Sequence, residues 1–300
     1  MAPAALVEAR HLVMASVQAQ ARQVGLWQEH AALGWWQSGL PAMAANLVVH
    51  CGPLAGDRQV CALARLLARS GPAAGWLVWP DQRPEHQRAL LQGCGFHLCE
   101  RIELASFNVS QNVSQTVFLP PSRPAGDGAG ERVGCRPLAA ADRPACAVLL
   151  QACHGVPAAV AAVVAAAFVD APPLLLAHGS LQLQTLAIWQ QGRPVATITA
   201  ALWRPLEPTH GPACGGLLWL GTDPAWRRRG YGMQVTAAAC AWLQQQGAQR
   251  LHVQASAAAA SIYRGLGFAH DGWLELWGCV PFSRSAETHR ERHRPDPRRV

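Results

Sequence analysis

The chain has 300 residues, enough for two domains of ordinary size, and half of them are hydrophobic, which excludes a globally disordered protein. Its formal net charge is +7, and all 25 basic residues are arginine, because the sequence contains no lysine. Catalysis through a lysine Schiff base is therefore excluded, and so is acetylation of a lysine side chain of this protein.

The first 110 residues alternate between strand and helix patterns. Strands are predicted over 47–49, 75–80 and 98–109, and helices over 57–68 and 85–92. The composition then changes, because residues 110–115 are polar and residues 120–128 are rich in turn and linker residues. We therefore predict four parts: a domain over 1–110, a linker over 111–130, a domain over 131–283 and a disordered, arginine-rich tail over 284–300.

The pattern over residues 131–283 predicts a mixed α/β sheet flanked by helices. Residues 156–169 are apolar and alanine-rich, but at 14 residues they are too short to span a bilayer and indicate a buried helix. The other predicted strands are 133–138, 181–189, 194–203, 217–222 and 250–254, and the other predicted helices are 145–152 and 233–246.

A loop rich in arginine and glycine lies between the strand over 217–222 and the helix that follows. It runs from Pro224 to Gly232 and contains the pattern Arg-x-x-Gly-x-Gly. Glycine lets the backbone come close to an anion, and the first N–H groups of a helix point toward it. This strand–loop–helix therefore predicts a site that binds a phosphate group.

A second motif, Tyr263-Arg264-Gly265-Leu266-Gly267-Phe268, begins 31 residues after Gly232. The two motifs, in this order and at this spacing, resemble the GNAT superfamily of acyl-CoA-dependent N-acetyltransferases over roughly residues 131–280. The resemblance implies a GNAT fold. In that family the first motif binds the pyrophosphate of acetyl-CoA, and the second supplies a tyrosine near the thioether sulfur.

The first half contains a weaker copy of the second motif. Residues 91–96 align with residues 263–268, with Leu91 where Tyr263 stands, and no Arg-x-x-Gly-x-Gly pattern accompanies them. The layout resembles tandem GNAT proteins in which one domain is degenerate, so we predict two tandem GNAT-like domains. The first would be structural or would shape the acceptor pocket. The alternative is a coincidental Gly-Phe pair after a helix.

The resemblance also implies the site residues. Tyr263 would be the general acid for the CoA thiolate. Ser256 stands near a position where many family members carry Asn or Asp, so that contact with CoA is in doubt. The residues expected to bind acetyl-CoA are Leu220, Gly221, Thr222, Arg227, Arg228, Arg229, Gly230, Tyr231, Gly232, Met233 and Ser256.

The general base stays open. Four residues are candidates, namely Glu207, His210, Asp223 and His252, and histidine has the most suitable unperturbed pKa. Several enzymes of the family remove the proton through water, without one essential base.

The function expected from the resemblance is transfer of an acetyl group from acetyl-CoA to a primary amine, by direct attack in a ternary complex. The acceptor would be a small molecule or a protein amine. A non-catalytic acyl-CoA sensor or scaffold is the alternative, and nucleic-acid binding has only the basic tail in its favour.

Ten scattered cysteines and no secretory segment predict a reduced, cytoplasmic protein. We expect no metal, nucleic-acid or membrane partner, and the oligomeric state stays open.

Overall fold

The computed structural model describes residues 3–30, 32–40, 42–50, 56–70, 73–109, 134–207 and 211–279. The predicted linker and the predicted tail therefore lie outside the described residues. The helices are α1 (Pro3–Ala21), α2 (Asp57–Ser70), α3 (Pro84–Gly93), α4 (Arg143–His154), α5 (Ala158–Phe168), α6 (Tyr231–Gln245) and α7 (Ala260–Gly265). The strands are β1 (Leu26–His30), β2 (Leu33–Gln37), β3 (Leu47–His50), β4 (Ala74–Val78), β5 (His97–Asn108), β6 (Cys135–Pro137), β7 (Leu174–Leu176), β8 (Gly179–Gln190), β9 (Arg193–Pro205), β10 (Cys214–Thr222), β11 (Arg250–Ala255) and β12 (Ala269–Cys279).

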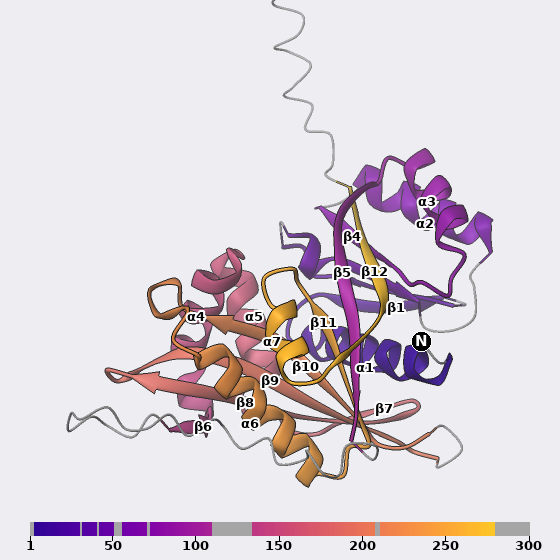
Figure 1. Cartoon of the computed structure of the whole chain (residues 1–300). Coiled ribbons are helices and arrows are strands. Elements are labelled where there is room, and N and C mark those ends of the chain that lie inside the picture. The colour runs from indigo at the N-terminus through magenta and orange to yellow at the C-terminus, as the bar shows by residue number, and fades with distance from the viewer. Residues whose placement is uncertain are drawn as a thin grey trace, which may run out of the picture.

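All twelve strands belong to one mixed sheet. Its order is β1-β2-β3-β4-β12-β5-β11-β10-β9-β8-β6, and the short β7 pairs with β8 outside this path. The sheet therefore continues without a break from the first half of the chain into the second (Figure 1).

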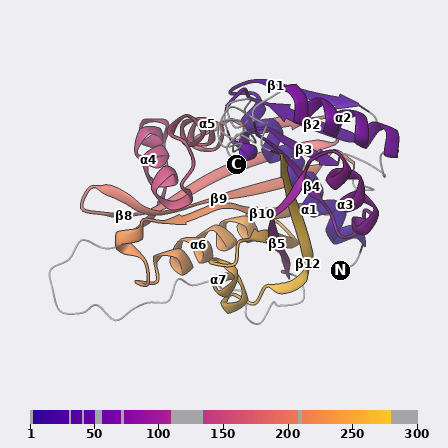
Figure 2. The same cartoon turned by 90° about the horizontal axis from the view of Figure 1, so that it is seen from above.

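Helices cover both faces of the sheet (Figure 2). Helices α1, α4 and α5 share one apolar core on one face. On the opposite face α6 and α7 pack over β8 to β11, and α2 and α3 pack over β3, β4 and β12. Each layer buries the apolar side of its helices against the sheet, as an α/β architecture requires.

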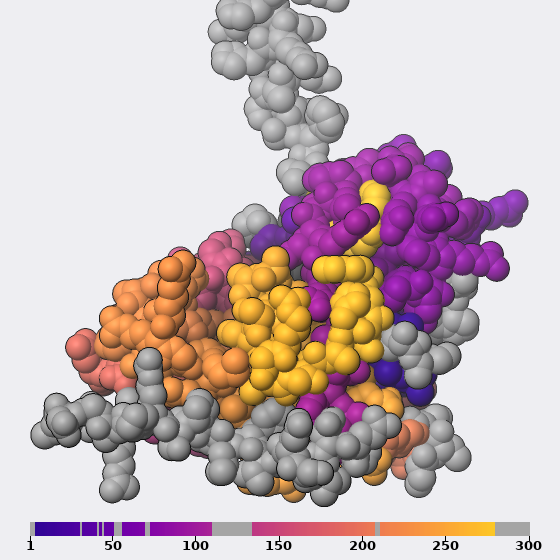
Figure 3. All heavy atoms as spheres, in the orientation of Figure 1, coloured from indigo at the N-terminus to yellow at the C-terminus, as the bar shows by residue number. Residues whose placement is uncertain are grey.

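The two halves of the chain exchange their last strands. Strand β5, from the first half, lies between β11 and β12, and β12, from the second half, lies between β4 and β5. Figure 3 shows the result on the surface, where yellow atoms of the C-terminal strand are set within the magenta surface of the first half. Each half-sheet is therefore completed by a strand from the other half.

The segments that lead into the exchanged strands have the same geometry. In the first half the Phe96 N–H donates to the Leu91 carbonyl at 3.0 Å, and in the second the Phe268 N–H donates to the Tyr263 carbonyl at 3.0 Å. The glycine before each phenylalanine has a positive φ, of 90° in the first half and 88° in the second. Residues 91–96 and 263–268, which the sequence aligns, thus form the same turn.

The pairing of β5 with β12 is symmetric about one point. Ile102 and Leu274, each the sixth residue after its phenylalanine, are directly opposite each other. The flanking pairs follow the same symmetry, and they are Arg101 with Glu275 and Glu103 with Trp273. A local twofold relation therefore connects the two exchanged strands, as expected if the halves are copies.

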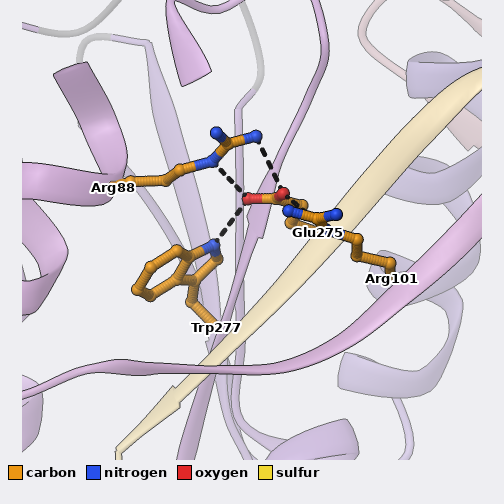
Figure 4. A network of polar contacts seen from close by, with 4 residues as sticks. All are labelled: Arg88, Arg101, Glu275 and Trp277. Atoms are coloured by element: carbon orange, nitrogen blue, oxygen red, sulfur yellow. Dashed lines mark hydrogen bonds and ion pairs between the residues drawn. The ribbon is translucent and has the colours of Figure 1, made fainter. Parts of the chain in front are cut away.

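Glu275, on β12, is the centre of the buried polar network drawn in Figure 4. Its side chain is 3 % exposed and accepts two hydrogen bonds of 2.8 Å from Arg88 of α3, one of 3.2 Å from Arg101 of β5, and one of 3.0 Å from Trp277. Burial would raise the pKa of this carboxyl, but the hydrogen bonds and charges outweigh it and the pKa is lowered. The network ties the exchanged strand β12 to the first half.

We expect Glu275→Ala to lower the free energy of unfolding by about 2 to 3 kcal/mol, because three donors lose a buried charged acceptor. The loss stays below the upper range for buried ion pairs, since the Arg88 and Arg101 side chains are 35 % and 59 % exposed and can reach water. Urea unfolding measures it. Glu85→Ala, an exposed carboxylate in the first turn of α3, is the control and should cost less than about 1 kcal/mol. Equal losses in the two variants would contradict this assignment.

The predicted elements over 47–109 and 133–254 are present, within a few residues at each end. The helix α1, the hairpin of β1 and β2, and the short strand β7 were not predicted, while the apolar segment 156–169 forms α5 as expected. The division at residue 110 stays a prediction. Among the described residues, no helix has the length and apolar character needed to cross a bilayer.

Candidate functional site

Strands β10 and β11 start as parallel neighbours and then separate. Their pairing extends from Cys214 opposite Arg250 to Leu217 opposite Val253 and ends there, although β10 continues to Thr222. On its other side β10 pairs with β9, with a break in register between Leu218 and Gly221. Beyond Leu217 the backbone of β10 is therefore no longer paired with β11, and a ligand can enter between the two strands.

The irregularity is a bulge at Trp219, whose φ is +54°, a left-handed conformation that is rare for a bulky residue. The structure places Gly221 just after the bulge, where a Cβ atom would lie 2.9 Å from Cys153 Cβ and 3.3 Å from His154 Nε2. Gly221 is thus needed for the close approach of α4.

The loop after β10 ends in the exposed N-terminus of α6. Gly230 caps the helix with a φ of +84°, and the first bond of the helix runs from the Gln234 N–H to the Gly230 carbonyl. The N–H groups of Tyr231, Gly232 and Met233 therefore have no acceptor within the helix. Together with the positive end of the helix dipole, they form the kind of site that binds a phosphate group.

Three exposed arginines surround this N-terminus, and they differ in conformation. The Arg227 side chain turns back, and its Nε donates to the Thr222 carbonyl at 3.2 Å. Arg228 has a φ of +60°, and the Arg229 guanidinium lies 4.7 Å from the centre of the Trp226 ring. Their positive charge reinforces the attraction of the loop for anions.

A cavity of about 340 Å³ opens where β10 and β11 separate. The first half of the chain lines it with Val13, Ser16, Val17, Gln20, Leu47, Leu77, Glu100 and Ile102. The second half lines it with His154, Leu217, Leu218, Trp219, Leu220, Gln254, Ser256, Ala259, Tyr263 and Leu276. Both halves are therefore needed to form it.

Tyr263, the predicted general acid, lies on α7 and lines this cavity. Its side chain is 3 % exposed, and burial raises the pKa of its phenol, so the hydroxyl stays protonated at neutral pH. Among the described residues its hydroxyl has no hydrogen-bond partner. A protonated phenol at the wall of a cavity can donate to a ligand inside it.

The predicted cofactor residues lie around this same region. Leu220 and Ser256 line the cavity, and Ser256 is exposed. Gly232 joins the loop to α7, because a Cβ atom there would lie 3.0 Å from Ile262 Cδ1 and 3.3 Å from Thr222 Oγ1. The structure thus brings the first turn of α6, the end of β10 and the helix of Tyr263 together, while the role of each residue stays a prediction.

The candidate bases lie elsewhere, and none of the three that are described lines the cavity. Asp223 accepts from Arg193 and from the Ala225 N–H, and Glu207 follows the end of β9. His252 is bonded to Glu8 at 2.9 Å. His210 lies outside the described residues.

Five polar residues of the cavity were missed by the sequence analysis, and they are Ser16, Gln20, Glu100, His154 and Gln254. Glu100 comes from β5 and is exposed, Gln20 comes from α1 and is buried, and His154 is the last residue of α4. The His154 ring packs edge-on against the Trp219 ring, with the ring centres 5.1 Å apart. Desolvation lowers the pKa of the His154 imidazole, and a hydrogen bond with the Trp219 backbone raises it in part. No local signal marks these residues, because strand exchange and helix packing bring them to the cavity.

One group in the described part of the chain has the geometry of metal ligands, and it consists of the buried residues Glu8, Cys214 and His252. Both carboxylate oxygens of Glu8 already accept from Arg250 at 3.0 Å. Burial also raises the pKa of the Cys214 thiol, which leaves it protonated and a poor ligand. The group fits an ion-pair network that anchors α1 to β11 better than a metal site.

The comparisons with known proteins agree with this geometry. The sequence profile of the Acetyltransferase (GNAT) family matches residues 165–268, which span from α5 to Phe268. No curated protein sequence matches the chain. Among solved structures, a GCN5-related N-acetyltransferase from Kribbella flavida is similar, with a TM-score of 0.59, 19 % identity, and coverage of 96 % of this chain and 99 % of that chain.

Two further solved structures share the fold. A functionally unknown conserved protein from Staphylococcus epidermidis has a TM-score of 0.54 and 10 % identity, over 86 % of this chain and 95 % of that chain. A Drosophila protein has a TM-score of 0.52 and 14 % identity, over 84 % of this chain and 74 % of that chain. The chain therefore has a mixed α/β GNAT fold and carries a GNAT-family acetyltransferase domain at residues 165–268.

Proposed function

We propose that this protein transfers an acetyl group from acetyl-CoA to a primary amine, by direct attack within a ternary complex. The observation that carries the proposal is the cavity between β10 and β11, which has on one wall the part of β10 that is not paired with β11, Tyr263 on another, and the N-terminus of α6 beside it. The family of the domain supports acyl transfer, and these features suit an acyl-CoA ligand.

Each part of the site has a task in this reaction. The N–H groups of Tyr231, Gly232 and Met233 bind the pyrophosphate, and the backbone of Leu220, beyond the last pair between β10 and β11, holds the pantetheine chain. The amine nitrogen then forms a bond to the carbonyl carbon of the thioester, and the bond between that carbon and sulfur breaks. The departing thiolate takes the proton of the Tyr263 hydroxyl.

The attacking amine must also lose a proton. His154 lines the cavity, and its lowered pKa keeps the imidazole neutral near pH 7, so it can accept that proton directly or through water. This assigns the proton to a residue that lines the cavity. Asp223 is instead paired with Arg193, and His252 contacts Glu8, both away from the cavity.

Two measurements test the proposed function. Calorimetric titration with acetyl-CoA and with free CoA should show micromolar binding of both, and thiol release with a panel of primary amines should show turnover above the rate without an amine. Binding without turnover on any amine would support the alternative, a non-catalytic acyl-CoA sensor or scaffold. No binding to the folded protein would contradict both.

The location and the partners are part of this proposal. Nine described cysteines are free thiols, which suits a reducing, cytoplasmic environment. We expect a small-molecule or protein amine as the acceptor and neither nucleic acid nor a membrane as a partner.

A further inference from the structure

We infer that the acceptor is a small amine with one positive charge and an otherwise apolar body, and that the first half of the chain binds it. This inference rests on the proposed function and adds the class of the acceptor. It is carried by the chemistry of the cavity lining that the first half of the chain and the exchanged strand β12 supply.

The apolar wall is the first observation. Six aliphatic side chains form it, from α1, β3, β4, β5 and the exchanged strand β12, and they are Val13, Val17, Leu47, Leu77, Ile102 and Leu276. Such a surface binds hydrocarbon and disfavours a second charge or a carboxylate, which would lose hydration without gaining a partner. The body of the acceptor is therefore apolar.

The charge of the wall is the second observation. Glu100 is the one carboxylate among the described residues of the cavity, and no hydrogen bond or ion pair connects its side chain to another described residue. Ile102 and Glu100 lie on the same side of β5, two residues apart, so the carboxylate stands beside the apolar wall. An unpaired carboxylate at such a site attracts an ammonium group.

Gln20 supplies the third observation. It lines the cavity from α1 and is 6 % exposed, and its Nε2 donates to the Ser16 carbonyl at 3.3 Å, while its Oε1 is buried without a partner. A buried, unpaired acceptor is costly, and an N–H of a bound amine would satisfy it. Glu100 and Gln20 thus offer two hydrogen-bond acceptors to an amine bound in this cavity.

The size of the cavity limits the acceptor. Its volume of about 340 Å³ equals the liquid volume of roughly ten water molecules, and the acetyl end of the co-substrate must share it. A molecule with a short hydrocarbon chain or a single ring fits this space. A peptide would have to place its backbone outside.

The test compares amines of equal chain length after acetyl-CoA binding has been verified by calorimetry. Hexylamine, 1,6-diaminohexane, 6-aminohexanoate and a short peptide with one lysine are assayed by thiol release. We expect kcat/KM to be at least about tenfold higher for hexylamine than for each of the other three. A preference for the peptide, or equal values for all, would overturn the inferred acceptor class and leave acetyl transfer standing.

Two variants test the assigned residues. Glu100→Gln should raise the KM for hexylamine about tenfold and leave kcat within about threefold, with unchanged acetyl-CoA affinity. Gln20→Leu removes the unpaired acceptor, so it should keep its stability and raise the same KM about threefold. The control is Glu85→Gln, on the exposed side of α3, which should change neither constant.

The possible outcomes test the acceptor class and the roles of its residues separately from acetyl transfer itself. A fall in kcat with an unchanged KM in Glu100→Gln would overturn the binding role and make Glu100 a base instead. An unchanged KM and kcat would overturn any role for it. Acetyl-CoA binding without thiol release on every amine would overturn the proposed function, and this inference with it.

Discussion

Replacing Gly230 with valine should weaken acetyl-CoA binding at least about 100-fold, or about 2.8 kcal/mol. Gly230 has a φ of +84° at the N-cap of α6, a conformation that a β-branched residue adopts only with strain. Relief of that strain turns the N–H groups of Tyr231, Gly232 and Met233 away from the phosphate. A new Cβ would meet only Gln234 Nε2, at 3.8 Å, so the loss should appear in binding more than in packing.

The same helix offers a matched control. Gly247 follows the other end of α6, has a φ of +86° and has no atom within 4 Å of an added Cβ. Gly247→Val therefore introduces similar backbone strain, of about 1 to 3 kcal/mol, away from the loop. Calorimetric titration should find acetyl-CoA affinity unchanged in this control. Equal losses of affinity in the two variants would mean that general destabilisation causes the effect, and would remove the loop from the proposed site.

Tyr263→Phe should lower kcat by about 100-fold, while the affinity for acetyl-CoA changes less than about twofold. General acid catalysis by a positioned side chain contributes about 100-fold to 10,000-fold, and the phenol is the group that would protonate the thiolate. The ring stays in place, because it packs against Phe268 with the ring centres 5.7 Å apart. Steady-state thiol release and calorimetry measure the two quantities.

The stability of this variant is its internal control. Since the Tyr263 hydroxyl has no partner among the described residues, its removal should change the free energy of unfolding by less than about 1 kcal/mol. A loss of turnover together with unfolding would give no support to an acid role. Unchanged turnover in a stable variant would remove Tyr263 from the mechanism.

The parts of the site that the sequence could predict are local ones. Gly230, Gly232 and Tyr263 stand in short motifs whose conformation depends on neighbouring residues. Tyr263 lines the cavity, and the two glycines lie at the N-cap and in the first turn of α6. The strands and helices after residue 133 likewise follow local periodicity. Local patterns were also enough to align residues 91–96 with 263–268, whose turns have the same hydrogen bond.

The remaining features depend on contacts between distant residues. The pairing of β5 with β11 brings residues 103–108 beside 250–255, and nothing in either segment specifies that partner. Glu100 and Gln20 reach the cavity only through this exchange and through the packing of α1. The left-handed backbone of Trp219 has no sequence signal either, since the glycine that favours irregular backbone stands two residues later.

The exchange of β5 and β12 has a consequence for synthesis on the ribosome. The first half leaves the exit tunnel with β3, β4 and β5 complete, but the strand that belongs between β4 and β5 is β12, which is among the last described segments to be made. Until then, strand edges that are paired in the finished protein are open, and open edges favour association with other chains. The edges of β4 and β5 therefore stay open until β12 has left the exit tunnel and can pair with them.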